Sequence, residues 1–353
     1  MKSMSSAKTI LVTMGDLCGI GPEIVAMAVA APEPDLDARL CVLGDVAVMR
    51  RAMAWTGVEL PLLHLSSLDE LVDLPPRCVA VWQPDGLPAG LLDCCMGAID
   101  AKAGAAAAVC IEAAVRAIQA GKADALVTAP IHKEALHAAG IGYPGHTEML
   151  QALAAEGGGA APVRMMLANN ELRTVLVTIH CSLRQAIDLI NIERVLETVR
   201  IAQRAMLSFG IAAPRIAVAG LNPHAGEGGL FGDEEIRHIA PAIAQARAEG
   251  IDASGPFAPD TVFMRARDVA GHPGEFDVVV AMTHDHGLIP VKYLGVEQGV
   301  NVTLGLPFVR TSPDHGTAFD VAGSGRADAS SLKAALAMAC RLLPLSAPRA
   351  LRP

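Results

Sequence analysis

Residues 9–30 read TILVTMGDLCGIGPEIVAMAVA, a β-branched run, a glycine-rich turn and a longer apolar stretch. The run 9–13 has consecutive apolar residues, as in a strand covered on both faces, and residues 22–31 are predicted to form a helix. The glycines of the turn fall at positions 15, 19 and 21, which matches neither the GxGxxG dinucleotide fingerprint nor a P-loop. The stretch therefore predicts one strand–helix unit of an α/β fold but does not identify a ligand.

The same alternation continues along the chain. Further strands are predicted at 40–43, 78–82, 125–128, 163–167, 174–178, 215–219, 277–282 and 301–304, and further helices at 98–120, 192–209, 233–248 and 330–342. Alternating strands and helices are typical of an α/β fold with a largely parallel sheet. The length of 353 residues favours two domains.

Composition excludes several classes of protein. The chain has 28 Lys and Arg against 37 Asp and Glu, and a net charge of −9 is poor for a general nucleic-acid binder. We find no uncharged apolar stretch long enough for a transmembrane helix, and the short polar segment 1–8 does not resemble a signal peptide. The eight cysteines show no CxxC spacing, which indicates reduced thiols in a cytoplasmic protein.

Three histidines occupy equivalent positions in the predicted fold. His180, His224 and His284 each follow a predicted strand, and ligands of open α/β sheets bind beyond the carboxyl ends of strands. Three imidazoles there could share one metal ion and leave coordination positions open for a substrate. The alternative is that each is an ordinary loop or capping histidine. Asp285 and His286 could orient the third imidazole or transfer a proton.

Other polar residues form candidate anion sites. His146 and Thr147 open a predicted helix, whose N-terminus favours anions, although Thr147 could serve only to cap that helix. Lys292, Asn301 and Arg310 lie at the polar edges of the late strands, where they could hold phosphate or carboxylate groups or could simply be surface residues.

Two glycine-rich segments complete the set of candidates. The glycines of segment 220–232 would let the backbone approach a ligand closely, or would serve a long surface loop. Segment 315–327, HGTAFDVAGSGRA, resembles the loop with which isocitrate and isopropylmalate dehydrogenases hold the adenosine part of NAD(P). Its alternative interpretation is a turn before the last helix.

Taken together, these motifs resemble the 4-hydroxythreonine-4-phosphate dehydrogenase family. The matching segments are MGDLCGIGPEI (14–24), TAPIHKEAL (128–136), GYPGHTEML (142–150), GLNPHAGEGGLFGDEEI (220–236), GPFAPDTVF (255–263), HDHGLIPVKYLG (284–295) and GVNVTLGLPFVRTSPDHGTA (299–318). They extend from residue 14 to about 330 and are individually improbable.

The resemblance implies a fold, a division into domains and a site. The fold would be that of the isocitrate/isopropylmalate dehydrogenase group, with two α/β/α domains around a cleft. Residues 1–133 and 303–353 would form one domain, with much of the NAD site, and residues 134–302 the other, with metal ligands and the interface of a homodimer that shares its active sites. The implied site residues are His180, His224 and His284 for a divalent metal, His146, Thr147, Lys292, Asn301 and Arg310 for substrate, and His315, Gly316, Thr317 and Ala318 for NAD.

The implied reaction is the metal- and NAD-dependent oxidation and decarboxylation of 4-phosphooxy-L-threonine to 3-amino-2-oxopropyl phosphate, in pyridoxal 5'-phosphate biosynthesis. Lys292 and Asp285 are the candidates for proton transfer. Three imidazoles favour Zn over Co or Ni, while Mg prefers oxygen ligands.

Three departures from the family pattern leave the substrate open. They are His286 in place of Gln, the order IPVK at 289–292 and the sequence TAFD at 317–320, and all three are more similar to a sister group that oxidises 4-phospho-D-threonate or 4-phospho-D-erythronate. A third branch oxidises the cis-dihydrodiol of terephthalate. The retained segment 145–148 (GHTE) favours a phosphorylated substrate over this aromatic one.

Overall fold

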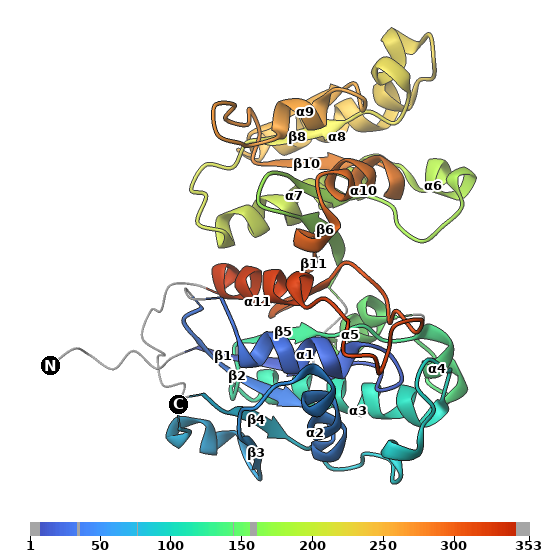
Figure 1. Ribbon diagram of the computed structural model, residues 1–353. Coiled ribbons are helices and arrows are strands. Elements are labelled where there is room, and N and C mark those ends of the chain that lie inside the picture. Colours follow the sequence, from blue (N-terminus) through green and yellow to red (C-terminus); the bar gives the residue numbers. More distant parts are fainter. Residues whose placement is uncertain (1–7, 34–35, 76, 144, 156–160, 344–353) are drawn as a thin grey trace, which may run out of the picture. The chain divides into compact units, whose positions relative to one another are not determined.

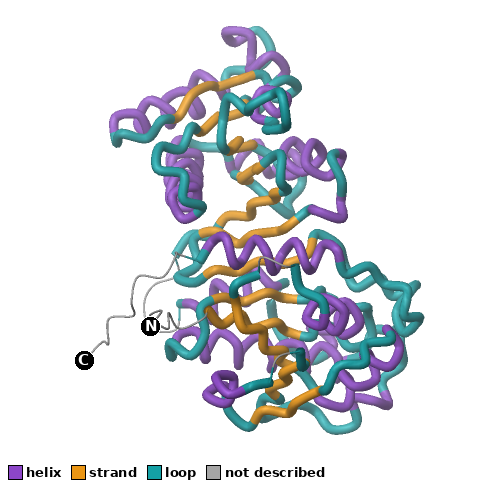
Figure 2. Tube along the Cα trace, turned by 60° about the vertical axis from the view of Figure 1, so that its left-hand side comes forward, coloured by secondary structure: helices purple, strands orange, loops and turns teal. Residues whose placement is uncertain are grey.

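The computed structural model describes residues 8–33, 36–75, 77–143, 145–155 and 161–343 (Figure 1). Residues 1–7 of the polar N-terminal segment lie outside this range. The chain divides into two compact units, residues 1–161 with 306–353 and residues 162–305. Both combine strands and helices, which confirms the predicted α/β class (Figure 2).

The first unit has a parallel sheet in the order β3-β4-β2-β1-β5-β12. Its strands are β1 (Lys8–Thr13), β2 (Ala38–Leu43), β3 (Leu62–Leu65), β4 (Val79–Trp82), β5 (Ala125–Thr128) and β12 (Val309–Pro313). Its α-helices are α1 (Gly21–Ala30), α2 (Val46–Thr56), α3 (Ala101–Gln119), α4 (Lys133–Ala138), α5 (His146–Ala154) and α11 (Ser330–Leu342). Helix α1 packs against α2 and α11, and α3 packs against α4 and α5.

The second unit has the strand order β11-β6-β7-β10-β8-β9, in which β6 is antiparallel to both neighbours. Its strands are β6 (Arg164–Ala168), β7 (Arg173–Leu176), β8 (Ile216–Ala219), β9 (Ala253–Phe257), β10 (Val278–Ala281) and β11 (Val300–Leu304). Its α-helices are α6 (Leu183–Leu189), α7 (Ile192–Ser208), α8 (Ala240–Ala248), α9 (Val262–Ala266) and α10 (His284–Tyr293).

The core is aliphatic because the buried strands consist mainly of Ile, Leu, Val and Ala. Ile10, Leu11 and Val12 of β1 are completely buried, as consecutive apolar residues predict for a strand covered on both faces. Helices α3 and α4 meet at Gly104, where a Cβ atom would lie 2.1 Å from the carbonyl oxygen of Ala135. Only glycine at position 104 allows α3 and α4 to pack this closely, so this position of the Ala-rich helix α3 is specific for contact with α4.

The structure corrects three features of the sequence analysis. Strands β3, β9 and β12 were not predicted. For β9 (ASGPF) and β12 (VRTSP) the reason is that they contain residues that are rare in strand interiors. The predicted helix 233–248 begins with a π-helical turn at Glu235–Ile239. The first unit extends to residue 161 rather than 133, because α4 and α5 pack on α3, and its C-terminal part begins at 306 rather than 303.

Candidate active site

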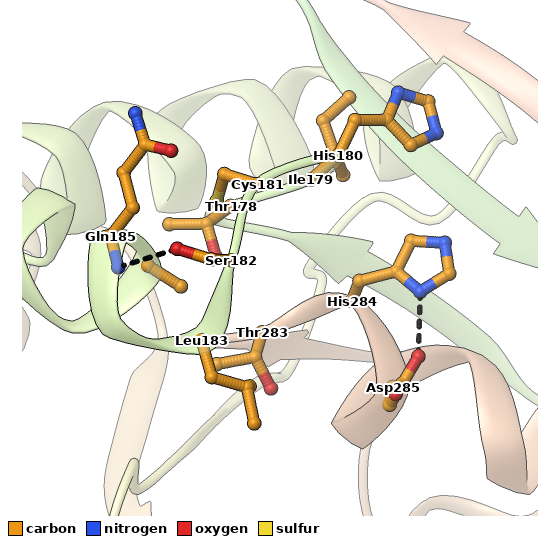
Figure 3. A pocket seen from close by; sticks show the side chains of 11 residues that line it. Thr178, Ile179, His180, Cys181, Ser182, Leu183, Gln185, Thr283, His284 and Asp285 are labelled. Carbon is orange, nitrogen blue, oxygen red and sulfur yellow. Dashed lines mark hydrogen bonds and ion pairs between the residues drawn. The ribbon is translucent and has the colours of Figure 1, made fainter.

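Two of the three histidines predicted to bind a metal, His180 and His284, lie close together in the second unit. Strands β7 and β10 are parallel neighbours, so their carboxyl ends share one edge, and His180 and His284 follow those ends. Their ring centres are 5.9 Å apart, with the ring planes tilted by 44°. Figure 3 shows both rings on the side of the pocket away from Gln185 and Ser182.

The imidazole pair lines a pocket of about 450 Å³. Nδ1 of His284 lies 2.8 Å from a carboxylate oxygen of Asp285 (Figure 3). A histidine that donates one ring N–H to a carboxylate presents its other nitrogen as a ligand. Asp285 therefore selects Nε2 of His284 as the atom available to a cation.

The spacing of the pair fits a bound divalent metal. Two imidazoles on one tetrahedral cation have ring centres about 5 Å apart at ordinary Zn–N distances. The 5.9 Å between His180 and His284 is close to this value. Among the residues that the structure describes, no three His, Cys, Asp or Glu side chains of one chain gather around a common point. Two imidazoles from one chain would leave the coordination of such a cation incomplete.

His224 occupies an unusual left-handed turn after β8. The residues from 224 to 228 all have positive φ, and three of them, His224, Ala225 and Glu227, are not glycine. Glu235 holds the turn, because its buried carboxylate accepts bonds from the backbone N–H groups of Leu221 (2.7 Å) and Asn222 (2.8 Å). The nearest aromatic ring to His224 is that of Phe231, at 6.1 Å, rather than either of the paired imidazoles.

The remaining predicted residues of this unit lie on α10 and β11. Lys292 is in the last turn of α10 and is half-buried, while Asn301 is on β11 with its side chain partly exposed. Burial lowers the pKa of His286, and the neighbouring Asp285 opposes this effect. His286 therefore loses its proton more readily than a free histidine.

The first unit contains a buried cation at the edge of its sheet. Arg310 on β12 is 2% exposed and donates a 2.6 Å hydrogen bond to Oγ1 of Thr128 on the neighbouring β5. Burial lowers the pKa of Arg310 to about 9, which still leaves it charged at pH 7. A charge that is buried in this way is well placed to bind an anion.

His146 faces this arginine from the first turn of α5. Burial, and then the charge of Arg310, hold the pKa of His146 well below its usual range, so the ring is neutral at pH 7. Its Nε2 atom is buried and has no hydrogen-bond partner among the described residues. Thr147 lies in the same first turn, so the helix N-terminus and the guanidinium, both of which the sequence analysis predicts to bind an anion, are brought together into what we call the cradle.

The predicted cofactor loop is folded over the turn that follows β1. The carbonyl of Thr317 accepts a 2.9 Å bond from the N–H of Ile20, and Thr317 is buried. His315 bonds through Nδ1 to the carbonyl of Gly316, while its buried Nε2 has no partner among the described residues. Ala318 adopts a positive φ of 42°.

Two acidic residues of this region were not singled out by the sequence analysis. Glu23 on α1 is buried and accepts bonds from the N–H groups of Gly323 (2.8 Å) and Gly325 (2.7 Å). Asp16 is also buried and accepts a 2.8 Å bond from Cys18. The available signal was the presence of acids inside an otherwise apolar, glycine-rich segment.

Comparisons with known proteins show that the chain is an α/β dehydrogenase. The profile of a family described as "Pyridoxal phosphate biosynthetic protein PdxA" matches residues 36–339. The chain belongs to this family, which confirms the resemblance inferred from its motifs.

Relatives and solved structures agree with this assignment. A 4-hydroxythreonine-4-phosphate dehydrogenase of Beijerinckia indica is 54% identical over 94% of each chain. A D-threonate 4-phosphate dehydrogenase of Salmonella typhimurium is 43% identical over 95% of this chain and 99% of its own. The crystal structure of a 4-hydroxythreonine-4-phosphate dehydrogenase from Klebsiella pneumoniae is 42% identical, with a TM-score of 0.84 over 96% of this chain and 99% of that one.

Proposed function

We propose that this dehydrogenase oxidises 4-phosphooxy-L-threonine with NAD+ and releases CO2, forming 3-amino-2-oxopropyl phosphate for pyridoxal 5'-phosphate biosynthesis. The imidazole pair carries the proposal, because His180 and His284 are spaced for one divalent cation. The buried guanidinium of Arg310 beside the neutral His146 supports a phosphorylated substrate. The 54% identity to a 4-hydroxythreonine-4-phosphate dehydrogenase favours this phosphate ester.

A second candidate is the oxidation of 4-phospho-D-threonate or 4-phospho-D-erythronate. His286 and Phe319 depart from the pattern of the biosynthetic branch, and D-threonate 4-phosphate dehydrogenases are 43% identical to this chain. Both candidates use the same phosphate cradle. The aromatic cis-dihydrodiol of terephthalate is less favoured, because a dehydrogenase that acts on it is more distant from this chain, at 31% identity.

The residues present fit both groups that the reaction needs. Nε2 of His284 is oriented for a cation by Asp285, and the nitrogen donors favour Zn, with Co and Ni as alternatives. A divalent cation there would lower the pKa of the substrate hydroxyl and stabilise the negative charge left by CO2. The buried, unpartnered Nε2 of His315 and the open space around Gly316 suit contacts with NAD along the segment 315–318.

The chemistry assigns simple roles to the chain's own side chains. The carbon that carries the hydroxyl gives a hydride to NAD+, and the hydroxyl proton passes to a base, for which we propose Lys292. The resulting ketone loses its neighbouring carboxylate as CO2, and a proton returns to the carbon left behind. Asp285 keeps His284 in one tautomer, while Arg310, His146 and Asn301 hold the substrate.

We further propose a homodimer in which the partner subunit's His224 completes the metal site. Large apolar side chains are exposed around α6 and the left-handed turn, including Leu183 (68%), Leu230 (73%) and Ile236 (55%). Exposed apolar groups of this size are typical of an interface between subunits. In the described part of the chain no helix is long and apolar enough to cross a membrane. The eight free cysteines support a cytoplasmic location.

The substrate is tested by measuring NADH formation with 4-phosphooxy-L-threonine, 4-phospho-D-threonate, 4-phospho-D-erythronate and the terephthalate cis-dihydrodiol, together with the bound metal. The highest kcat/KM for 4-phosphooxy-L-threonine supports the first candidate, and the highest value for either sugar acid supports the second. No NADH with any phosphate ester would refute both.

Subunit mixing tests the shared metal site. His224→Ala and His180→Ala homodimers should each be inactive. If His224 acts across the interface, mixed dimers contain one intact site, and an equal mixture should recover roughly a quarter of the wild-type rate. No recovery, with exchange of subunits verified by mass spectrometry, would show that each chain supplies all of its own ligands.

A further inference from the structure

The first unit contains a buried carboxylate oxygen that the proposed chemistry leaves unused. Asp16 follows β1 and is completely buried. One of its oxygens accepts a 2.8 Å bond from the N–H of Cys18, while Oδ2 has no hydrogen-bond partner among the described residues. Burial raises the pKa of this carboxyl. An oxygen that is buried without a well-formed hydrogen bond is costly, which makes Oδ2 of Asp16 a candidate acceptor for a ligand that supplies a donor.

His132 offers a second buried atom beside Asp16. It follows β5, the parallel neighbour of β1, and the turns after the two strands are joined by a 2.9 Å bond from the N–H of Asp16 to the carbonyl of Pro130. Both the backbone N–H and the ring of His132 lie close enough to Asp16 to lower its pKa, although burial outweighs them. Its Nδ1 is buried and has no partner among the described residues.

An aromatic stack fixes the orientation of this imidazole. The rings of His132 and Phe319 have centres 4.8 Å apart and are almost parallel, at 13°. Phe319 belongs to the loop whose Thr317 carbonyl bonds to Ile20, in the same turn as Asp16. The loop that we propose for NAD therefore packs on the His132 ring and is hydrogen-bonded to the turn that contains Asp16.

The hydrogen-bonding properties of Oδ2 of Asp16 and Nδ1 of His132 determine which chemical group the two atoms can bind. The ionised carboxylate of Asp16 can only accept a hydrogen bond, whereas Nδ1 of His132 can donate one in the appropriate tautomer. A primary carboxamide provides the matching NH2 donor and C=O acceptor on one carbon atom. A phosphate or carboxylate would be repelled by Asp16, and the first unit already has a cationic cradle for such anions at Arg310.

We propose that Asp16 and His132 bind the carboxamide of the nicotinamide ring of NAD+, with the NH2 group donating to Asp16 and the carbonyl accepting from His132. This subsite rests on the proposed function, because it requires NAD as the cofactor. It also explains why Phe319 stacks on His132, since the stack holds Nδ1 in place. The pair are binding and positioning residues that set the orientation of the reactive ring.

Two cofactor analogues separate the two hydrogen bonds. The 3-acetylpyridine analogue of NAD+ keeps the carbonyl and replaces NH2 by a methyl group, and thionicotinamide NAD+ keeps NH2 but has a weakly accepting sulfur. Calorimetric titration of the wild type should show Kd values roughly 10-fold to 100-fold above that of NAD+ for the acetylpyridine analogue. In Asp16→Asn the affinity for NAD+ should fall and this discrimination should shrink to within about 3-fold. Asp69→Asn, an exposed change of the same type, should retain it.

A pair of substitutions tests His132 independently. His132→Phe keeps an aromatic ring for the stack on Phe319 but removes the nitrogen, so it should lose discrimination between NAD+ and the thionicotinamide analogue. His132→Asn places an amide N–H near the position of Nδ1 and should recover part of that discrimination. This pair also carries the test if Asp16→Asn does not fold.

The outcomes distinguish this subsite from the proposed function. If the wild type neither binds nor reduces NAD+, the proposed function fails and the subsite fails with it. If the wild type uses NAD+ but the variants weaken NAD+ and both analogues equally, Asp16 and His132 have only a structural role and the subsite alone is refuted.

Discussion

The carboxylate of Glu235 is expected to stabilise the second unit by holding the left-handed turn that carries His224. It accepts bonds from the N–H groups of Leu221 and Asn222, and its other oxygen accepts a 2.9 Å bond from Nδ2 of Asn222. The turn itself is strained, because left-handed conformations of non-glycine residues cost about 1–2 kcal/mol each. It therefore depends on outside support.

Glu235→Gln keeps the shape of the side chain but removes its charge. The amide oxygen can still accept from the two backbone groups, whereas the amide nitrogen would face the Nδ2 donor of Asn222. One hydrogen bond to a charged group is lost and two are weakened, and Glu235 is only 3% exposed, so water does not replace them. We expect the free energy of unfolding to fall by about 3 kcal/mol.

Urea unfolding followed by circular dichroism measures this change, and a Zn titration of the folded protein measures its effect on His224. Glu234→Gln is the matched control, because Glu234 also accepts from Asn222 (2.7 Å) but is partly exposed, and it should cost under about 1 kcal/mol. Zn affinity should fall in Glu235→Gln and stay near the wild-type value in Glu234→Gln. A Glu235→Gln protein within about 0.5 kcal/mol of the wild type would refute the reasoning.

Three further changes probe other parts of the chain. Arg310→Lys keeps the charge but loses the guanidinium fork, so the KM for the phosphorylated substrate should rise roughly 10-fold to 100-fold while the Kd for NAD+ is unchanged, as steady-state kinetics and calorimetry would show. Gly104→Ala places a Cβ atom 2.1 Å from the carbonyl oxygen of Ala135 and should cost roughly 2–4 kcal/mol in urea unfolding. Burial raises the pKa of Asp277, but hydrogen bonds from Arg215 outweigh it and leave the pKa below its ordinary value of 3.8. Asp277→Asn should therefore be less stable than the wild type at pH 7, and the difference should shrink as the pH falls below 3.8 and through the lower pKa of Asp277 in the folded protein.

Each of these expectations has a contrary result. An unchanged KM in Arg310→Lys would place the phosphate elsewhere, and wild-type stability of Gly104→Ala would mean that α3 and α4 can separate freely. A stability difference for Asp277→Asn that is constant from pH 7 to pH 2 would show that its ionisation does not contribute.

The elements predicted correctly are those whose pattern is purely local. Strand β5 was predicted at its observed bounds, because four buried apolar or β-branched residues stand between polar turns. Strand β12 was missed because Arg310 has the pattern of a surface residue, yet this arginine is buried and hydrogen-bonded to Thr128 on the neighbouring strand. Arg310, the residue that departs from the strand pattern, is thus also a candidate substrate-binding residue.

In the candidate site, too, local features could be predicted from the sequence and contacts between distant residues could not. The positions of His180 and His284 after strands were readable from the sequence, but their meeting depends on β7 and β10 being neighbours, which strand order decides. The support of His224 by Glu235 and the pairing of Asp16 with His132 join residues from separate turns. No spacing in the sequence predicts such contacts.

The sequence by itself determined the α/β class, the family and the residue types available for chemistry, because apolar periodicity and long motifs are properties of the chain alone. The tertiary structure decided which of these residues meet, which charges are buried and which buried atoms have no partner. The physical reason is that desolvation and hydrogen bonding depend on neighbours in space, and these are set by the order of the strands and the path of the turns between them.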